Sequence, residues 1–348
     1  MVSTGYAYPM KLIRCAGPVL SLALAISLLP ATSAQAAPSL NDVRTQIRIL
    51  QEQAATAGEA AHQAKIEYNA LTQKLESVRR QASADAATVS KFKNSLGAIA
   101  NEQYKSGPLS QSLELLFSSN PELFLSAAGS LESVTRKQSL QLKQYSVAKQ
   151  RLTATSLTVN DKLELAKKAQ ARFVAQEKAV KDKLATAERL LKSLSKAEQA
   201  RLARLNAASE KKDQKKSIAL ASKSKLGSGR GSLALRFSIK QIGDRYVYGA
   251  AGPTLWDCSG LTMRAFGTAG VSLPHSAAAQ SKYGKSVPLS QLKPGDLVFF
   301  GKNRYISHVG IYISKGRMVN APRPGSSVKI QAFTPNFGSL SFYGARRL

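Results

Sequence analysis

Cysteine and histidine are scarce in this sequence of 348 residues, which contains two cysteines and three histidines. Cys15 lies in the N-terminal segment described next, so Cys258 has no partner for an internal disulfide, and a fold stapled by disulfides is excluded. The histidines and cysteines also lack the spacing of a metal site, so no catalytic metal and no cofactor are expected. Acidic residues are few as well: 21 stand against 50 lysines and arginines, and the formal net charge is +29.

Residues 1–37 are typical of a secretory signal. Lys11 and Arg14 precede the apolar run 19–29, and Ala34-Gln35-Ala36 forms a small-residue cleavage site. The apolar run is short for a membrane span, which favours cleavage over the alternative of an uncleaved anchor. No later segment has 18 consecutive apolar residues. The sequence therefore predicts a secreted protein of the cell wall or cell surface.

The excess of basic residues extends over both the helical and the C-terminal parts of the chain. In the cytosol such a charge would point first to nucleic acid, but an exported chain meets wall polymers and anionic lipid surfaces instead. We therefore expect no nucleic-acid partner. The alternative, for the helical part above all, is a solvated surface without a polyanionic partner.

Glycine and proline are absent from long stretches. Residues 39–106 contain no proline, and residues 130–226 contain neither residue. In the first stretch small or apolar residues recur at a 3,4 spacing, which predicts a heptad seam and a left-handed coiled coil. The seam runs through Leu40, Val43, Ile47, Leu50, Ala54, Ala57, Ala61, Ala64, Tyr68, Leu71, Leu75, Val78 and Ala82. Asp85 interrupts it. A looser seam in the second stretch predicts an antiparallel helical partner, with the coiled-coil region covering residues 38–205.

Two segments depart from the coiled-coil pattern. Residues 107–129 are rich in leucine and phenylalanine around Asn120-Pro121, which predicts a short helical insert at the tip of the hairpin. Its apolar residues form either a docking patch or a buried cap. Residues 206–232 are rich in lysine, serine and glycine, and this composition predicts a linker. A second domain is expected over residues 233–348, where glycine and proline separate short β-like runs.

Cys258 stands in the run Trp256-Asp257-Cys258-Ser259-Gly260, just before an apolar, helix-like segment. A lone cysteine is either a small buried hydrophobe or a reactive thiol. An idle thiol is a liability in an oxidising compartment, and a helix N-terminus lowers a thiol's pKa, so a nucleophile is the better explanation. Asp257 is placed to cap that helix, and the N–H groups of its first turn could stabilise an oxyanion.

A cysteine nucleophile needs a base, and the three histidines differ as candidates. His62 falls in the polar coil and is expected to be solvated, and His275 is expected in a turn. His308 opens a β-like run in which alternation puts His308, Gly310 and Tyr312 on one face. The opposite face, with Val309 and Ile311, is apolar, so His308 is the expected base.

Several motifs in order resemble the NlpC/p60 family of cell-wall cysteine peptidases over roughly residues 233–345. They are Tyr246-x-Tyr248-Gly249, Asp257-Cys258-Ser259-Gly260-Leu261, Leu273-Pro274, Pro294-Gly295-Asp296-Leu297-Val298-Phe299-Phe300, His308-Val309-Gly310-Ile311-Tyr312 and Asn320-Ala321-Pro322. The resemblance implies an α+β papain-like catalytic domain behind a long all-α antiparallel coiled coil. It also implies hydrolysis of peptidoglycan stem peptides between D-glutamate, through its γ-carboxyl, and the following diamino acid.

The same resemblance implies roles for single residues. Cys258 matches the nucleophile, His308 the base and Asn320 the third, orienting residue. The residues that match substrate contacts are Tyr246, Asp257 and Ser259. The family often has histidine where Asn320 stands, and an amide fixes the imidazole tautomer but stabilises the imidazolium less than a carboxylate.

A shared face for His308 and Asn320 requires a particular hairpin. A strict two-residue turn at Lys315-Gly316 would point Asn320 away from His308. We therefore predict a bulge here or an odd-numbered loop, which would pair Tyr312 with Asn320.

Peptidoglycan hydrolysis in wall remodelling or cell separation is the leading hypothesis. A non-catalytic wall-binding scaffold or activator, and acyl transfer by the same thiol, are the alternatives. The coil and its Tyr104-Lys105-Ser106-Gly107 run loosely resemble the N-terminal regions of wall hydrolases that a division-linked membrane complex activates, which implies such a complex as a partner. Autoinhibition, in which the coiled coil covers Cys258, is a further hypothesis.

Overall fold

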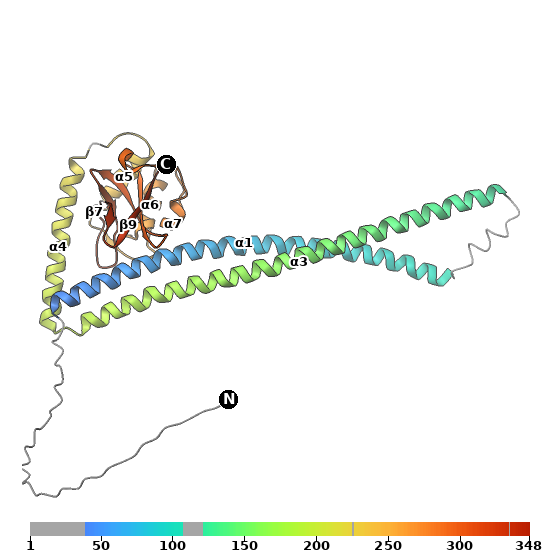
Figure 1. Ribbon diagram of the computed structural model, residues 1–348, viewed down its shortest axis with the longest axis horizontal. Helices are drawn as coiled ribbons and strands as arrows, with labels where there is room; N and C mark the ends of the chain where they lie inside the picture. Colours follow the sequence, from blue (N-terminus) through green and yellow to red (C-terminus); the bar gives the residue numbers. More distant parts are fainter. Residues whose placement is uncertain (1–38, 107–120, 225, 334) are drawn as a thin grey trace, which may run out of the picture. The chain divides into compact units, whose positions relative to one another are not determined.

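In a computed structural model, two long helices precede a small α+β domain (Figure 1). The structure describes residues 39–106, 121–224, 226–333 and 335–348. The expected signal segment and residues 107–120 of the expected insert lie outside these ranges. No helix of the described residues is both long and apolar enough to cross a membrane.

Helices α1 (Leu40–Ser106) and α3 (Pro121–Lys192) form the expected coiled coil, and they pack along one another. With 67 residues, α1 is about 100 Å long at 1.5 Å per residue. The alanine-rich part of the seam is the most closely packed, because Ala54, Ala57 and Ala61 are all buried. Residues 121–129 belong to α3, so this part of the expected insert is continuous helix.

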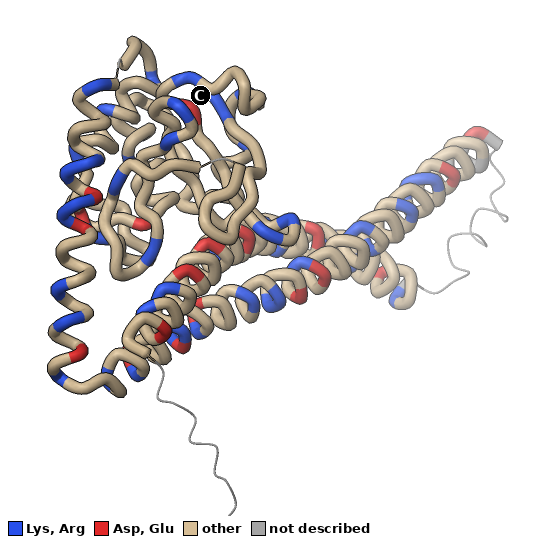
Figure 2. The backbone as a smooth tube through the Cα atoms, turned by 60° about the vertical axis from the view of Figure 1, so that its left-hand side comes forward, with Lys and Arg blue, Asp and Glu red and all other residues tan. Residues whose placement is uncertain are grey.

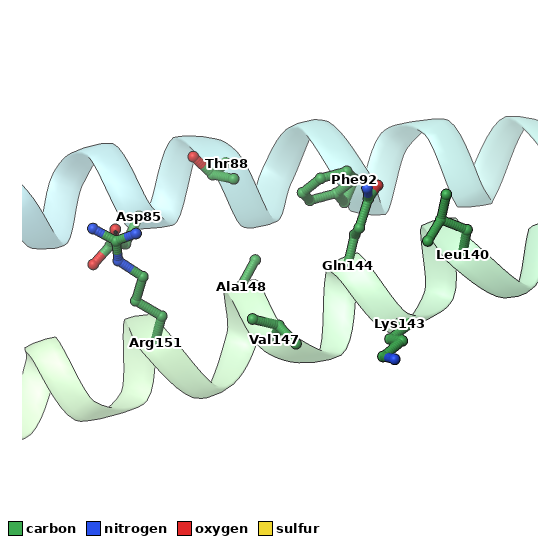
Figure 3. Close-up of a pocket in the computed structure, with 9 residues that line it drawn as sticks. All are labelled: Asp85, Thr88, Phe92, Leu140, Lys143, Gln144, Val147, Ala148 and Arg151. Atoms are coloured by element: carbon green, nitrogen blue, oxygen red, sulfur yellow. Dashed lines mark ion pairs between the residues drawn. The ribbon is translucent and has the colours of Figure 1, made fainter.

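The break in the seam at Asp85 is a buried polar contact between α1 and α3. Its carboxylate accepts hydrogen bonds from Gln81 (2.9 Å) and Thr155 (2.8 Å) and pairs with Arg151 (3.1 Å). A cavity of about 450 Å³ opens beside this contact, between Phe92 of α1 and residues of α3 (Figure 3). At this position an ion pair between Asp85 of α1 and Arg151 of α3 takes the place of an apolar contact in the seam.

Helix α4 (Lys196–Ser222) follows α3 after a break at Ser195, where a capping box begins the new helix. The structure therefore differs from the linker expected over 206–232, since residues 206–222 are helical. Leu202 and Ser217 are buried, and the Ser217 hydroxyl accepts from the backbone N–H of Ile330 (2.9 Å). Packing of α4 on the C-terminal domain explains why a lysine-rich segment is ordered as a helix. Lysine and arginine residues recur along α3 and α4 (Figure 2).

The C-terminal domain is built on an antiparallel sheet with strand order β3-β9-β4-β5-β6-β7, and β8 pairs with β9. These strands are β3 (Lys285–Val287), β4 (Leu297–Lys302), β5 (Tyr305–Ser314), β6 (Arg317–Asn320), β7 (Lys329–Ala332), β8 (Asn336–Phe337) and β9 (Leu340–Arg347). Two further short strands pair in parallel, β1 (Arg245–Tyr246) and β2 (Leu255–Trp256).

Helices α5 (Arg230–Lys240) and α6 (Cys258–Gly267) pack against one face of the sheet. The short helices are α7 (Ala277–Gln280) and the 3-10 helix η1 (Leu289–Gln291). The expected alternation in β5 is confirmed, because Val309 and Ile311 join the core beneath α5 and α6. The opposite face is covered by a second apolar cluster of Phe300, Met318, Phe333 and neighbours.

Candidate active site

Cys258 lies at the start of α6, held there by the cap that the sequence predicts. The Asp257 carboxylate accepts from the backbone N–H of Gly260 (2.7 Å) and of Gly249 (2.8 Å). Gly260 is required at its position because a Cβ there would lie 2.3 Å from the carbonyl oxygen of Ala250. The cap and the close approach fix the direction in which the cysteine side chain leaves the helix.

His308 and Asn320 meet across β5 and β6, as the sequence predicts. His308 Nε2 lies 3.1 Å from Asn320 Oδ1. A carbonyl oxygen only accepts, so Nε2 carries the proton and Nδ1 keeps its lone pair. The Asn320 amide donates to the carbonyl oxygen of Lys329 and to Gln331 Oε1, both at 3.4 Å, which fixes its orientation.

The predicted bulge is present between Tyr312 and Ser314. The predicted pairing was wrong, however, because Tyr312 faces Met318 and not Asn320. The connection is a two-residue turn at Lys315 and Gly316, which both have positive φ, as a turn matched to strand twist requires. The bulge alone shifts the register by one residue and places Asn320 on the face of His308.

The sulfur of Cys258 lies against the middle of β5, where the backbone N–H of Val309, next to His308, is close enough to lower the pKa of the thiol. His308 itself stacks on Phe337, with ring centroids 4.7 Å apart and planes 10° apart. Burial lowers the pKa of His308 to about 4, against the opposing effect of the Asn320 hydrogen bond. The imidazole is therefore neutral at pH 7, the form a general base needs.

The three expected substrate contacts also gather at the sulfur. Tyr246 is buried in the same apolar cluster as Cys258, and Asp257 and Ser259 flank the cysteine in sequence. Burial, followed by the charge of a nearby Cys258 thiolate, raises the pKa of Tyr246, so the phenol keeps its proton. The tertiary structure thus brings all six predicted residues to one place.

A residue that the sequence analysis missed occupies this place: Glu59 of α1. Its Oε1 accepts from the Ser259 hydroxyl (2.6 Å) and the Cys258 thiol (3.1 Å), and its Oε2 accepts from the backbone N–H of Ala277 (2.6 Å). Glu59 and Cys258 are each only 2% exposed. In the docked arrangement α1 covers the cysteine.

His62, one turn further along α1, also reaches the domain and is not solvated as expected. Its Nε2 lies 3.0 Å from Asp257 Oδ2, and the Nε2 of His275 lies 2.8 Å from Asp257 Oδ1. Burial alone would raise the pKa of Asp257, but the hydrogen bonds from His275 and His62 outweigh it and lower that pKa to about 2. Asp257 is therefore ionised and engaged on both oxygens.

The docking face of α1 has its own helical spacing, separate from the heptad seam that the sequence predicts. Ala55, Gly58, Glu59 and His62 recur at i, i+3, i+4 and i+7, which defines a second face beside the seam to α3. Gly58 permits the close approach, because a Cβ there would lie 2.6 Å from the Tyr248 ring. One sequence signal could have revealed this face. Gly58 stands inside a long helix and is followed by Glu59 and His62 on the same helix face.

The docked thiol does not have the lowered pKa that the helix N-terminus predicts. Burial first, then the carboxylates of Glu59 and Asp257, raise the pKa of Cys258 well above its ordinary value. The prediction was wrong for this arrangement because it took the helix terminus in isolation, whereas two buried carboxylates disfavour a nearby thiolate. A docked α1 therefore keeps the Cys258 thiol both covered and protonated.

We expect docking of α1 to weaken as the pH rises. Burial and then Asp257 raise the pKa of Glu59, so the docked state binds the Glu59 proton more tightly than the undocked state. This contribution is complete below the ordinary glutamate pKa of about 4.3 and is lost as the pH rises through the raised value. The raised pKa of Cys258, to which burial and the charge of Glu59 contribute, acts in the same direction.

Amide exchange of α7, corrected for intrinsic rates, measures this effect because Ala277 donates to Glu59. Protection at Ala277 should be lower at pH 8 than at pH 5. The Glu59→Gln variant, which cannot titrate, should show a smaller difference. Equal pH dependence in both proteins would contradict the role given to Glu59.

A cysteine at the start of a helix that packs on a histidine-bearing antiparallel strand is the arrangement of papain-like cysteine peptidases. Within that class, residues 243–347, most of the C-terminal domain, match the NlpC/P60 family.

Two proteins named as probable endopeptidases are similar to part of this chain. "Probable endopeptidase p60" of Listeria monocytogenes is 49% identical over 86 residues, 25% of this chain and 18% of that protein. "Probable endopeptidase Rv2190c" of Mycobacterium tuberculosis is 40% identical over 119 residues, 34% of this chain and 30% of that protein. The chain spans less than a third of the length of these relatives. The crystal structure of the NlpC/p60 domain of the peptidoglycan hydrolase SagA has 30% identity and a TM-score of 0.30, covering 34% of this chain and 98% of that one.

Proposed function

We propose that the protein is a secreted peptidoglycan endopeptidase that acts through a Cys-His-Asn thiol mechanism. The observation that carries the proposal is the position of the Cys258 sulfur, at the start of α6 and against the strand whose His308 is oriented by Asn320. The family of the domain and the endopeptidase names of its relatives support the same activity.

The residues divide the reaction between them. His308 Nδ1 takes the proton of the Cys258 thiol, and the thiolate sulfur adds to the scissile carbonyl carbon while the N–H groups of the first turn of α6 stabilise the oxyanion. The C–N bond then breaks, and His308 returns the proton to the leaving amine. Water next attacks the thioester with His308 as base, and this step releases the acid and restores the thiol.

The substrate is the stem peptide of peptidoglycan, cut between D-glutamate, through its γ-carboxyl, and the diamino acid. Asp257 is ionised, so it can pair with a cationic group in the N-terminal portion of the substrate. Ser259 and Tyr246 lie beside it, and the Ser259 hydroxyl already hydrogen-bonds a carboxylate, that of Glu59. These contacts are available to substrate only when His62 and Glu59 are withdrawn.

We further propose that docking of α1 keeps the enzyme latent. Glu59 covers the nucleophile and His62 engages Asp257, so one helix face blocks both the reacting atom and a substrate contact. Activation then consists of moving α1 away. A division-linked membrane complex acting on the coiled coil is the partner that we propose for this step, in a protein located at the cell wall or cell surface.

Mass spectrometry of digested muropeptides tests the function. The chain without residues 1–37 is incubated with peptidoglycan, beside a variant with α1 released, such as Gly58→Leu. We expect stems that end at D-glutamate and new peptides that begin with the diamino acid. Failure of both proteins to cleave would leave a binding scaffold, and new amide products in place of free stems would indicate acyl transfer.

Removal of the Asn320 amide should slow the chemistry more than it weakens binding. In the Gly58→Leu background we expect Asn320→Ala to lower kcat by about a hundredfold with little change in KM, because the imidazole loses its orienting acceptor. The limb of the pH profile set by His308 should move to lower pH, since the Asn320 hydrogen bond raises the pKa of His308.

The matched control for this variant is Gln331→Ala, which removes only an acceptor behind Asn320. It should lower kcat far less. An equal loss in both variants, or an unmoved pH profile in Asn320→Ala, would indicate a structural effect in place of an orienting one.

A further inference from the structure

Three possible metal ligands from distant parts of the sequence meet where α1 docks. They are His62 of α1, the cap residue Asp257, and His275 of the loop before α7, and each can offer one ligand atom within 4.8 Å of the others. The two imidazole rings stack with centroids 4.2 Å apart. Both turn Nε2 toward the same carboxylate, at 2.8–3.0 Å.

We propose that this cluster binds a divalent transition-metal ion of the zinc type. Two imidazole nitrogens and one carboxylate oxygen are a donor set that such ions favour, with a fourth position open to water. Bonds of about 2.0–2.2 Å in tetrahedral geometry separate ligand atoms by about 3.4 Å. The present separations are a few tenths of an ångström shorter, so small side-chain shifts would accommodate the ion.

The surroundings support a cation at this point. Backbone N–H groups of Gly249 and Gly260 hold the Asp257 carboxylate in place, as groups behind a metal ligand commonly do. The buried carboxylate of Glu59 also lies near and favours a positive charge. The positive charge of Lys65 has the opposite effect on His275. The side chains of His62 and His275 keep 11% and 23% exposure, which leaves a route for the ion and its water.

The ion would join α1 to the catalytic domain, because α1 supplies His62 and the domain supplies Asp257 and His275. An ion that needs all three ligands binds the docked state more tightly, and at a free concentration about 100 times its Kd it favours docking by about a hundredfold. This consequence rests on the proposed function, since it makes the ion a stabiliser of the latent enzyme. Ion binding itself does not rest on it.

Titration of the chain without residues 1–37 with Co²⁺ and Zn²⁺ tests the site without any substrate. We expect one ion per chain with a Kd tighter than about 10 µM, and a Co²⁺ visible spectrum without a thiolate charge-transfer band. His62→Ala and His275→Ala should each weaken binding at least about tenfold. Gly58→Leu, which leaves every ligand in place but hinders docking, should also weaken it.

Two control variants locate the ion. Cys258→Ala and His308→Ala remove the remaining thiol and imidazole of the described residues and should bind Co²⁺ as the parent does. Loss of binding in either would place the ion elsewhere and overturn the proposal, as would unchanged binding in His62→Ala or no binding by the parent. Cleavage of peptidoglycan by a protein that binds no metal would sink this inference while leaving the proposed function intact.

Discussion

The Gly58→Leu variant should cleave peptidoglycan about 5- to 150-fold faster than the parent chain. A Cβ at residue 58 would lie 2.6 Å from the Tyr248 ring, so with a leucine there either the ring or α1 must shift before α1 can dock. Overpacking of this kind costs about 1–3 kcal/mol, and this cost acts on the docked state alone. Leucine is also the better helix former, so α1 itself should not unfold.

Gly97→Leu is the matched control, because it makes the same change in the same helix where nothing lies within 4 Å of the new Cβ. It should leave the rate unchanged. Glu59→Ala provides an independent release, since it removes the carboxylate that bonds Ser259, Cys258 and Ala277. Unchanged rates in both Gly58→Leu and Glu59→Ala, with circular dichroism showing folded proteins, would refute latency.

The Cys258→Ala change should abolish cleavage, with a loss of about a thousandfold or more in kcat. The reason is that no other side chain in the site can form the thioester. The measurement belongs in the Gly58→Leu background, because the docked parent has little activity to lose. Product release is followed by mass spectrometry of soluble muropeptides.

Ser259→Ala in the same background is the comparison for Cys258→Ala. It removes a neighbouring hydroxyl that contacts Glu59 in the docked state, and it should change KM more than kcat. Retention of cleavage by Cys258→Ala would exclude a thiol mechanism and would direct attention to a water activated by His308. Near-complete loss of cleavage in both variants would show that the reaction depends on the whole first turn of α6 and not on the Cys258 sulfur alone.

Local sequence chemistry predicted much of the site. An aspartate before a helix start caps that helix wherever it lies in the fold, so Asp257 could be assigned from its neighbours. Strand alternation has a period of two residues, so the faces of β5 followed from the apolar pattern of Val309 and Ile311. The geometric need for a shared face predicted the bulge, although the pairing of Tyr312 depended on the type of turn.

Helix α4 shows where composition alone misleads. Its lysines and serines are typical of a linker, and no local pattern required a helix between 206 and 222. The hydroxyl of Ser217 meets the backbone of Ile330, and Lys329 pairs with Glu210 (2.8 Å) and Asp213 (3.0 Å). Contacts with a domain more than a hundred residues away order this segment, and a local reading cannot include them.

By itself the sequence determined the coiled coil, the α+β domain, and the cysteine, histidine and asparagine that we propose for one reaction, because periodicity, capping and motif order are local properties. Only the tertiary structure decided the state of that site. Glu59 and His62 stand nearly two hundred residues before Cys258 and Asp257, and the contacts of Glu59 with Cys258 and of His62 with Asp257 depend on which face of α1 meets the domain. The packing of Ala55 and Gly58 against the domain, where Gly58 meets Tyr248, determines which face docks. The same docking sets the pKa of the Cys258 thiol, since burial and neighbouring charge exist only in the folded chain.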